Sequence, residues 1–235
     1  KALEIFEDAL EIAEKLEDES GSVRILANLA VVNSSKGDFD KAFTLTKQAR
    51  ALAKESNSQI SYVHIDFNES HWNYEIGNFD KAMNMLDRLE KKLEGSAGEA
   101  WQGSISFVKG SCEFSRGDYD TSKQLFLNII NELELNNNKK MLLTNFVYYS
   151  LSLKKLDEDF DKLKLYKIIE ENEDEITYEL NLRLYELLGE ESYLIKAYNQ
   201  VLNLSKQMNG DIKDKFLNYH IQKNIMNNYE ILFSK

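Results

Sequence analysis

The six residues "GDFDKA" at positions 37–42 decide the fold, because this short motif recurs later in the chain. They return as "GNFDKA" at 77–82 and as "GDYDTS" at 117–122, so the phrase recurs every 40 residues. A fixed period of this length is typical of solenoids, in which each unit buries its apolar face only against its neighbours. The repetition therefore predicts a stack of similar units.

Four residues of the phrase have distinct physical roles at a turn between two helices. Gly37 follows a helical stretch, where the left-handed residue after a helix end costs glycine least. Asp38 is placed to cap the next helix by accepting from its free N–H groups. Phe39 offers an apolar side chain to the turn, and Ala42 is small enough to let paired helices approach closely. With the later copies, the structural repeat motif comprises Gly37, Phe39, Ala42, Gly77, Phe79, Ala82, Gly117 and Tyr119.

The composition favours helix throughout. The 235 residues include no proline, which would break helix interiors at a cost of roughly 3 kcal/mol. Apolar residues recur at helical spacing between the turns. We expect twelve helices, near residues 1–18, 21–36, 39–55, 59–76, 79–94, 98–116, 119–135, 138–156, 160–172, 174–188, 192–208 and 211–232.

The turns divide the chain without separating domains, so we expect one domain over residues 1–235. The repeats are clear over 1–126 and degenerate over 127–207, and residues 208–235 read as a single C-terminal helix. The sequence opens in mid-helix on Lys1 without a methionine, which predicts a fragment of a longer protein.

Charge and cysteine content exclude several classes of partner. The net charge of −11 argues against nucleic acid and anionic membranes, because both attract clustered lysine and arginine. No apolar run is long enough to span a membrane, and one cysteine cannot form an internal disulfide. These features predict a cytoplasmic protein.

No residue pattern indicates catalysis or a cofactor. His64 and His71 are seven residues apart, whereas two histidines that share a metal on one helix usually stand four apart. Asp157 begins a sequence like a calcium loop, but Lys162 stands where that loop needs glycine. Cys112 lies inside a predicted helix and reads as a buried core residue. We therefore expect no enzyme, no cofactor and no metal.

The phrase and its flanking helices resemble the tetratricopeptide repeat. The stretch "LANLAVVNSSKGDFDKAFTLTKQA" (26–49) carries the family's pattern of Leu26, Leu29 and Ala30 before the turn, with Ala42 and Ala49 after it. The period of 40 residues marks a long variant of a repeat that commonly has about 34. The resemblance implies an all-α fold, an α-solenoid of antiparallel helical hairpins wound as a right-handed superhelix.

Four residues depart from that pattern. Asn33 and Asn73 stand where tyrosine is usual, and Asp66 and Glu69 stand at positions that are normally apolar.

The resemblance also implies where a partner binds. In this family the first helices of successive repeats line a concave wall that holds an extended peptide or a helix. Carried over onto this sequence, the predicted groove contains Arg24, His64, Phe67, His71, Tyr74, Phe107, Ser111 and Phe114. Its aromatic side chains are typical binding anchors. Ala27 and Val31 occupy places where the family's clamp for chaperone tails needs lysine and asparagine, so we expect no binding of such tails.

Two functions remain open from the sequence. The first is a non-catalytic scaffold that binds a protein or peptide partner in the concave groove. The alternative is a regulatory or sensor segment of a larger bacterial signalling protein, such as a transcription activator, cyclase or kinase, which binds an effector or an adjoining domain. The oligomeric state is open in both.

Overall fold

The chain forms helices throughout the residues that the structure, a computed structural model, describes: 2–55, 59–93, 95–136, 141–172 and 176–233. Over these ranges it contains thirteen α-helices and no strand, which confirms the all-α prediction. The helices are α1 (Ala2–Lys15), α2 (Glu19–Ser35), α3 (Phe39–Glu55), α4 (Gln59–Glu75), α5 (Phe79–Lys92), α6 (Gly95–Arg116), α7 (Tyr119–Leu135), α8 (Leu142–Lys155), α9 (Lys162–Glu171), α10 (Tyr178–Leu188), α11 (Glu191–Ser205), α12 (Gly210–Asn218) and α13 (His220–Phe233).

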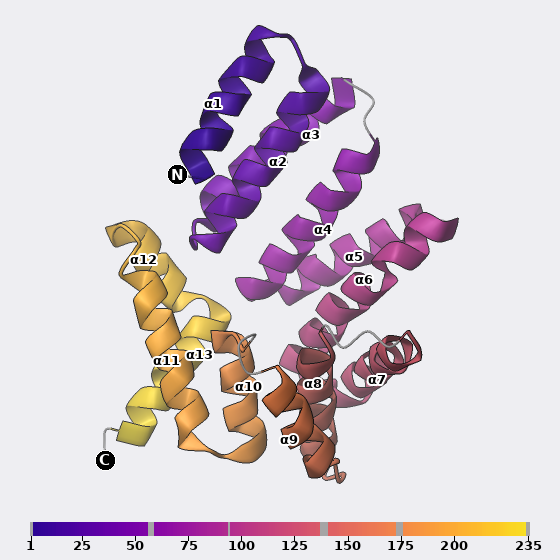
Figure 1. Ribbon diagram of the computed structural model, residues 1–235, viewed down its shortest axis with the longest axis vertical. Helices are drawn as coiled ribbons and strands as arrows, with labels where there is room; N and C mark the ends of the chain where they lie inside the picture. The colour runs from indigo at the N-terminus through magenta and orange to yellow at the C-terminus, as the bar shows by residue number, and fades with distance from the viewer. Residues whose placement is uncertain (1, 56–58, 94, 137–140, 173–175, 234–235) are drawn as a thin grey trace.

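The helices pair into antiparallel hairpins that stack on one another (Figure 1). Helices α2 and α3, α4 and α5, α6 and α7, and α10 and α11 pack as such pairs, and the first helix of each pair also contacts the first helix of a neighbouring pair. The stack curves so strongly that α11–α13 return towards α2 and α3 (Figure 1). The fold is an α-solenoid of helical hairpins.

The recurring phrase forms the turns between these helices. Gly37, Gly77 and Gly117 have φ angles of 77°, 87° and 88°, in the left-handed region that favours glycine. After the first of them, Asp38 Oδ1 accepts a hydrogen bond from the backbone N–H of Lys41 at 3.1 Å. The cap therefore fixes where α3 begins.

The small residues of the phrase lie where the paired helices meet. Ala42, Ala82 and Ser122 are fully buried, and Phe39 is 3% exposed. The Ser122 hydroxyl donates to the Gly110 carbonyl oxygen on the facing helix at 3.0 Å, so the backbones of α6 and α7 approach closely there. Small side chains at this position permit short distances between helix axes.

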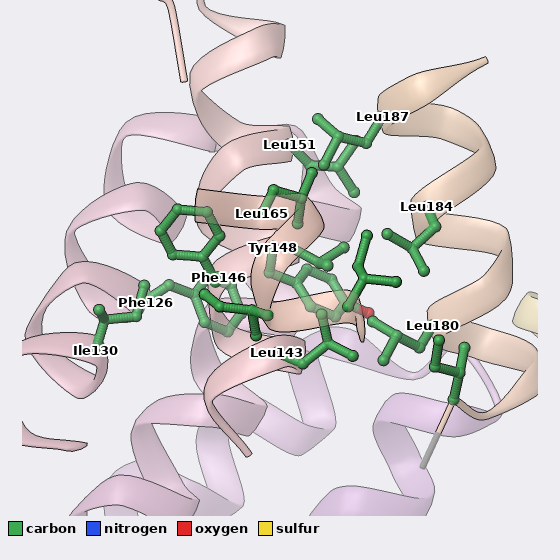
Figure 2. Packing of buried hydrophobic residues seen from close by; sticks show 14 of the residues in the cluster. Phe126, Ile130, Leu143, Phe146, Tyr148, Leu151, Leu165, Leu180, Leu184 and Leu187 are labelled. Atoms are coloured by element: carbon green, nitrogen blue, oxygen red, sulfur yellow. The ribbon is translucent and has the colours of Figure 1, made fainter. Parts of the chain in front are cut away.

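The largest core cluster joins α6 through α11. Figure 2 shows the rings of Phe126 and Phe146 and the aliphatic side chains of Leu165 and Leu184 gathered around Tyr148. The rings of Phe126 and Tyr148 stack with their centroids 5.0 Å apart. Aromatic pairs at this separation add to the stabilisation from apolar burial. The repeats from 127 onward are thus degenerate in sequence but well packed.

The C-terminal segment corrects one expectation. Residues 208–235 were expected to form one helix, whereas Tyr219 has an extended backbone (φ −66°, ψ 157°) and separates α12 from α13. The break lets Tyr219 turn towards the first repeat turn, where its ring meets Phe39 edge-on with centroids 5.0 Å apart. Tertiary packing therefore overrides the local helical preference.

The two asparagines that depart from the repeat pattern bond within their own helices. Asn33 Nδ2 donates to the Leu29 carbonyl oxygen at 2.7 Å, and Asn73 Nδ2 donates to the Glu69 carbonyl oxygen at 2.6 Å. Both asparagines are buried. Because the helix backbone satisfies these amides, each fills the space of a larger residue without an unpaired donor.

Candidate functional site: the inner wall

The first helices of the hairpins, α2, α4, α6, α8 and α10, form the inner wall of the solenoid. Several predicted groove residues on α2, α4 and α6 are at least partly accessible. Arg24 on α2 and His64 on α4 are exposed, and Phe67 and Phe107 are half-buried. The ring of Trp101 on α6 contacts both His64 and Phe67, with centroid distances of 4.8 and 5.1 Å. An aromatic surface thus crosses from α4 to α6.

Predicted groove residues near the ends of the same helices are covered. Tyr74, Ser111 and Phe114 are 1%, 0% and 6% exposed, so a partner cannot reach them in this structure. Phe114 is enclosed by Tyr148 and Arg183, whose ring centroid and guanidinium carbon lie 5.4 and 5.2 Å from the centroid of its ring. The curvature of the stack brings α8 and α10 over this part of the wall.

A buried hydrogen-bond network ties the covered part together. The Tyr74 hydroxyl lies 3.0 Å from the Tyr148 hydroxyl and donates to Glu179 Oε1 at 2.6 Å. Tyr148 also donates to Glu179 and accepts from Arg183 Nε at 3.2 Å. The network joins α4, α8 and α10 across the concave side. Sequence reasoning missed Glu179 and Arg183, although two charged residues four apart within the apolar stretch "YELNLRLYELLG" are a signal of an inward polar cluster.

An inner cavity of about 280 Å³ remains between the N-terminal and C-terminal hairpins. Helices α2, α3 and α4 form one side of it, with the accessible surface of His71 among its walls. Helices α10 through α13 form the other side. Its lining residues are Val31, Ser34, Ser35, Phe39, Asn68, His71, Trp72, Glu75, Tyr178, Leu204, Phe216 and Gln222.

The electrostatics of the inner cavity centre on Glu75. Its carboxylate Oε1 lies 3.7 Å from His71 Nε2, and its side chain is 28% exposed. Burial raises the pKa of Glu75 to about 8, and the nearby charge of Glu179 adds to the effect. Burial also lowers the pKa of His71, so this imidazole is neutral at pH 7. The wall therefore carries an acidic group that lacks a strong cationic partner.

Helices α12 and α13 close the cavity by docking on the first two repeat turns. The Tyr219 hydroxyl donates to the Gly37 carbonyl oxygen at 3.4 Å, and Lys215 pairs with Asp40. On the second turn, the rings of His220 and Phe79 meet edge-on at 5.1 Å. The third turn differs, because a Cβ built on Gly117 meets nothing within 4 Å.

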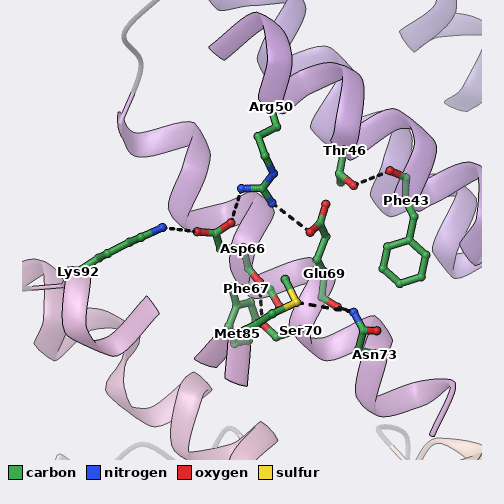
Figure 3. Close-up of polar contacts among 10 residues, drawn as sticks. All are labelled: Phe43, Thr46, Arg50, Asp66, Phe67, Glu69, Ser70, Asn73, Met85 and Lys92. Atoms are coloured by element: carbon green, nitrogen blue, oxygen red, sulfur yellow. Dashed lines mark hydrogen bonds and ion pairs between the residues drawn. The ribbon is translucent and has the colours of Figure 1, made fainter. Parts of the chain in front are cut away.

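The acidic residues that depart from the repeat pattern belong to an outer groove between α3, α4 and α5. Figure 3 shows Arg50 between Asp66 and Glu69, with nitrogen–oxygen distances of 2.5 and 3.0 Å, and Lys92 on the other side of Asp66 at 3.2 Å. Asp66 is 9% exposed. An ion network thus replaces the apolar contact that the repeat pattern favours at this junction.

The histidine and cysteine side chains that could support chemistry lie apart from one another. His64 packs on Trp101, whereas His71 faces the inner cavity. Cys112 is buried, and burial raises the pKa of its thiol to about 12, so it stays protonated at neutral pH. Among the described residues, no group of three or more His, Cys, Asp or Glu is arranged to hold a metal ion. None of the described helices has the length and apolar character needed to cross a membrane.

Comparison with known proteins agrees with this architecture. Residues 1–55, which include α1 to α3 and the first recurring turn, match the family model of the tetratricopeptide repeat. No curated protein matches the sequence. Repeats of this family generally mediate protein–protein interactions and are typically non-catalytic. Residues 1–55 are therefore similar to tetratricopeptide repeats, and over its described residues the chain is an α-solenoid of helical hairpins.

Proposed function

We propose that this protein is a non-catalytic scaffold that binds a segment of another protein across the accessible part of its inner wall. The surface runs from Arg24 on α2, past His64 and Phe67 on α4, to Phe107 on α6. The observation that carries the proposal is the aromatic surface at the α4–α6 boundary, where Trp101 contacts both His64 and Phe67. Aromatic side chains that are rigid and partly exposed are the commonest anchors of protein interfaces.

The proposed surface is narrower than the predicted groove. Tyr74, Ser111 and Phe114 serve the core, whereas Arg24, His64, Phe67 and Phe107 remain at least partly accessible. The exposed fraction of Val31 on α2 is 42%, so the inner wall also offers an aliphatic contact where it borders the inner cavity. A bound segment would cross α2, α4 and α6, with an apolar side chain on the rings and polar groups at Arg24.

A displayed peptide library selected on the purified protein tests this proposal. We expect selected peptides to share an apolar anchor and to lose at least about tenfold in affinity for Arg24→Glu combined with His64→Ala. The matched control is Lys47→Glu, which makes the same charge change at an exposed position on α3. Peptides that bind both variants as tightly as the unchanged protein would place the interaction elsewhere and contradict the proposal.

A second candidate function is a regulatory segment of a larger signalling protein, and the inner cavity favours it. The cavity lies between helices that are far apart in the sequence, so an effector bound there contacts both ends of the solenoid. Such a ligand would stabilise the docking of α12 and α13. Sequencing the complete reading frame tests this candidate: an attached catalytic or DNA-binding domain supports it, and a frame without one contradicts it.

A further inference from the structure

Four of the twelve residues that line the inner cavity are aromatic. Phe39, Trp72, Tyr178 and Phe216 line it, together with the imidazole of His71. These rings come from four different helices, so the fold gathers them from across the chain. Aromatic faces attract organic cations through the negative charge of their π systems, most strongly where water is excluded.

The charged groups of the lining are acidic. Glu75 carries the carboxylate of the described lining, which includes neither lysine nor arginine. His71 lies 3.7 Å from Glu75, but burial lowers the pKa of its imidazole, so it supplies little positive charge at neutral pH. The carboxylate is therefore open to a cation from outside.

The surroundings of Glu75 make its ionised form costly in the empty cavity. Burial and the charge of Glu179 on α10 raise the pKa of Glu75 to about 8. Glu179 is held in place by the hydroxyl groups of Tyr74 and Tyr148. On the opposite side of the cavity, Gln222 on α13 is 1% exposed and its Oε1 has no hydrogen-bond partner. The empty cavity thus favours the neutral form of Glu75, and a bound cation would favour its ionised form.

We propose that the inner cavity binds an organic ammonium ion, with the aromatic side chains around its methyl or methylene groups and Glu75 as its counter-ion. The volume of about 280 Å³ corresponds to roughly nine water molecules at about 30 Å³ each, which is enough for a choline-sized cation or the end of a lysine side chain. The inference deepens the second candidate function, since it names the chemistry of the effector. It is independent of the peptide surface at Arg24.

Calorimetry on the purified protein, with choline and its neutral carbon isostere 3,3-dimethylbutan-1-ol, tests the proposal. The two ligands have the same shape, so a difference reports the charge. We expect choline to bind at least about tenfold more tightly. Equal affinities for the two ligands, or binding of neither, would overturn the proposal.

Two variants locate the site. Glu75→Gln keeps the size of the side chain and should weaken choline binding about tenfold while leaving the isostere unchanged. The control is Asp80→Asn, whose side chain is 85% exposed on α5 and should leave both affinities unchanged. Unchanged choline binding in Glu75→Gln would show that the cation sits elsewhere and overturn the assignment.

A free amine and a peptide lysine share this chemistry, so a second ligand pair separates the two sources. N-acetyl-lysine methylamide carries the ammonium group on a peptide unit, and N-acetyl-norleucine methylamide lacks it. Tighter binding of the lysine compound than of choline assigns the cavity to a peptide side chain, and the reverse assigns it to a small molecule. Either result requires that the charged member of each pair bind more tightly than the neutral one.

The affinity for choline should rise as the pH increases towards about 8, with a proton released on binding, because the cation requires an ionised Glu75. The other titratable or charged groups near the site are His71 on α4, Tyr178, Glu179 and Arg183 on α10, and His220 on α13. The assignment to Glu75 requires that Glu75→Gln remove the pH dependence. A pH dependence that persists in this variant would contradict it.

Discussion

At the scale of single residues, the same phrase serves three different environments. Gly37, Gly77 and Gly117 share a left-handed backbone, but only the first two lie under the C-terminal helices. A Cβ on Gly37 would lie 2.9 Å from Phe216 Cδ2, whereas a Cβ on Gly117 would meet open space. The repeat therefore sets the backbone conformation, and the curvature of the stack decides what each turn touches.

Replacement of these glycines by alanine separates the two effects. Gly117→Ala should cost roughly 1–2 kcal/mol of unfolding free energy, because alanine disfavours the left-handed region. Gly37→Ala should cost a further 1–3 kcal/mol, roughly, because its methyl group overlaps the ring of Phe216. Urea unfolding of both variants measures the difference. Equal losses would mean that α12 does not pack on the first turn.

The pKa of Glu75 gives a prediction for the pH dependence of stability. The folded state holds this proton up to about pH 8, whereas the ordinary value is 4.5. The stabilisation is therefore fully present below about pH 4.5 and is lost as the pH rises through about 8. Relative to the unchanged protein, Glu75→Gln should become progressively more stable across this range and then level off.

Urea unfolding at a series of pH values measures that difference. Asp80→Asn is the control, because its exposed side chain should give a difference that does not change between the same two pH values. If the difference in unfolding free energy between Glu75→Gln and the unchanged protein also does not change with pH, then the carboxylate is solvated in the folded state.

The sequence predicts the features that depend on neighbours along the chain. The glycine turns, the cap at Asp38 and the buried Ala42 follow from residues within one repeat, and the structure contains them all. The contact of Tyr74 with Glu179 joins residues 105 apart, so it depends on the curvature summed over several hairpins. No local pattern encodes that sum, which is why Tyr74 and Phe114 look like groove residues in the sequence and lie in the core.

At the scale of elements, the junction of α3, α4 and α5 combines apolar and ionic contacts. Val23, Ala49 and Ile65 are fully buried beside it, whereas Arg50, Asp66 and Glu69 meet at the rim of the outer groove. The carboxylate side chains are 12% and 17% exposed, so water stabilises their charges only partly. The charges of Asp66 and Glu69 therefore depend on Arg50, which forms an ion pair with each of them.

Arg50→Met should destabilise the protein by about 1–3 kcal/mol. Removal of one partner from a buried ion pair costs about 3–5 kcal/mol, and the 35% exposure of the Arg50 side chain reduces that loss. The control is Lys15→Met, which removes an ion pair with Glu11 in which both side chains are exposed and should leave stability nearly unchanged. Thermal unfolding of the two variants checks the prediction, and equal melting temperatures would contradict it.

At the scale of the whole molecule, the solenoid is closed rather than open. In an open stack each hairpin contacts only its neighbours, and the two ends are energetically independent. Here α4 bonds to α8 and α10 through the hydroxyl of Tyr74, and α12 and α13 dock on the turns of the first repeats. The ends are therefore coupled, and the inner cavity between them exists only while both are folded.

A double-mutant cycle between Tyr74 and Tyr148 tests that coupling directly. Each change to phenylalanine removes one hydroxyl from the network around Glu179 and leaves the ring in place. Because the two hydroxyls contact each other at 3.0 Å and share one carboxylate, the losses in unfolding free energy should differ from additivity by about 0.5–3 kcal/mol. The control cycle pairs Tyr74→Phe with Tyr166→Phe, whose hydroxyl bonds to Glu190 on the exposed surface, and should be additive within about 0.5 kcal/mol. Additive losses in both cycles would mean that the hydroxyls of Tyr74 and Tyr148 are not coupled through Glu179 across the concave side.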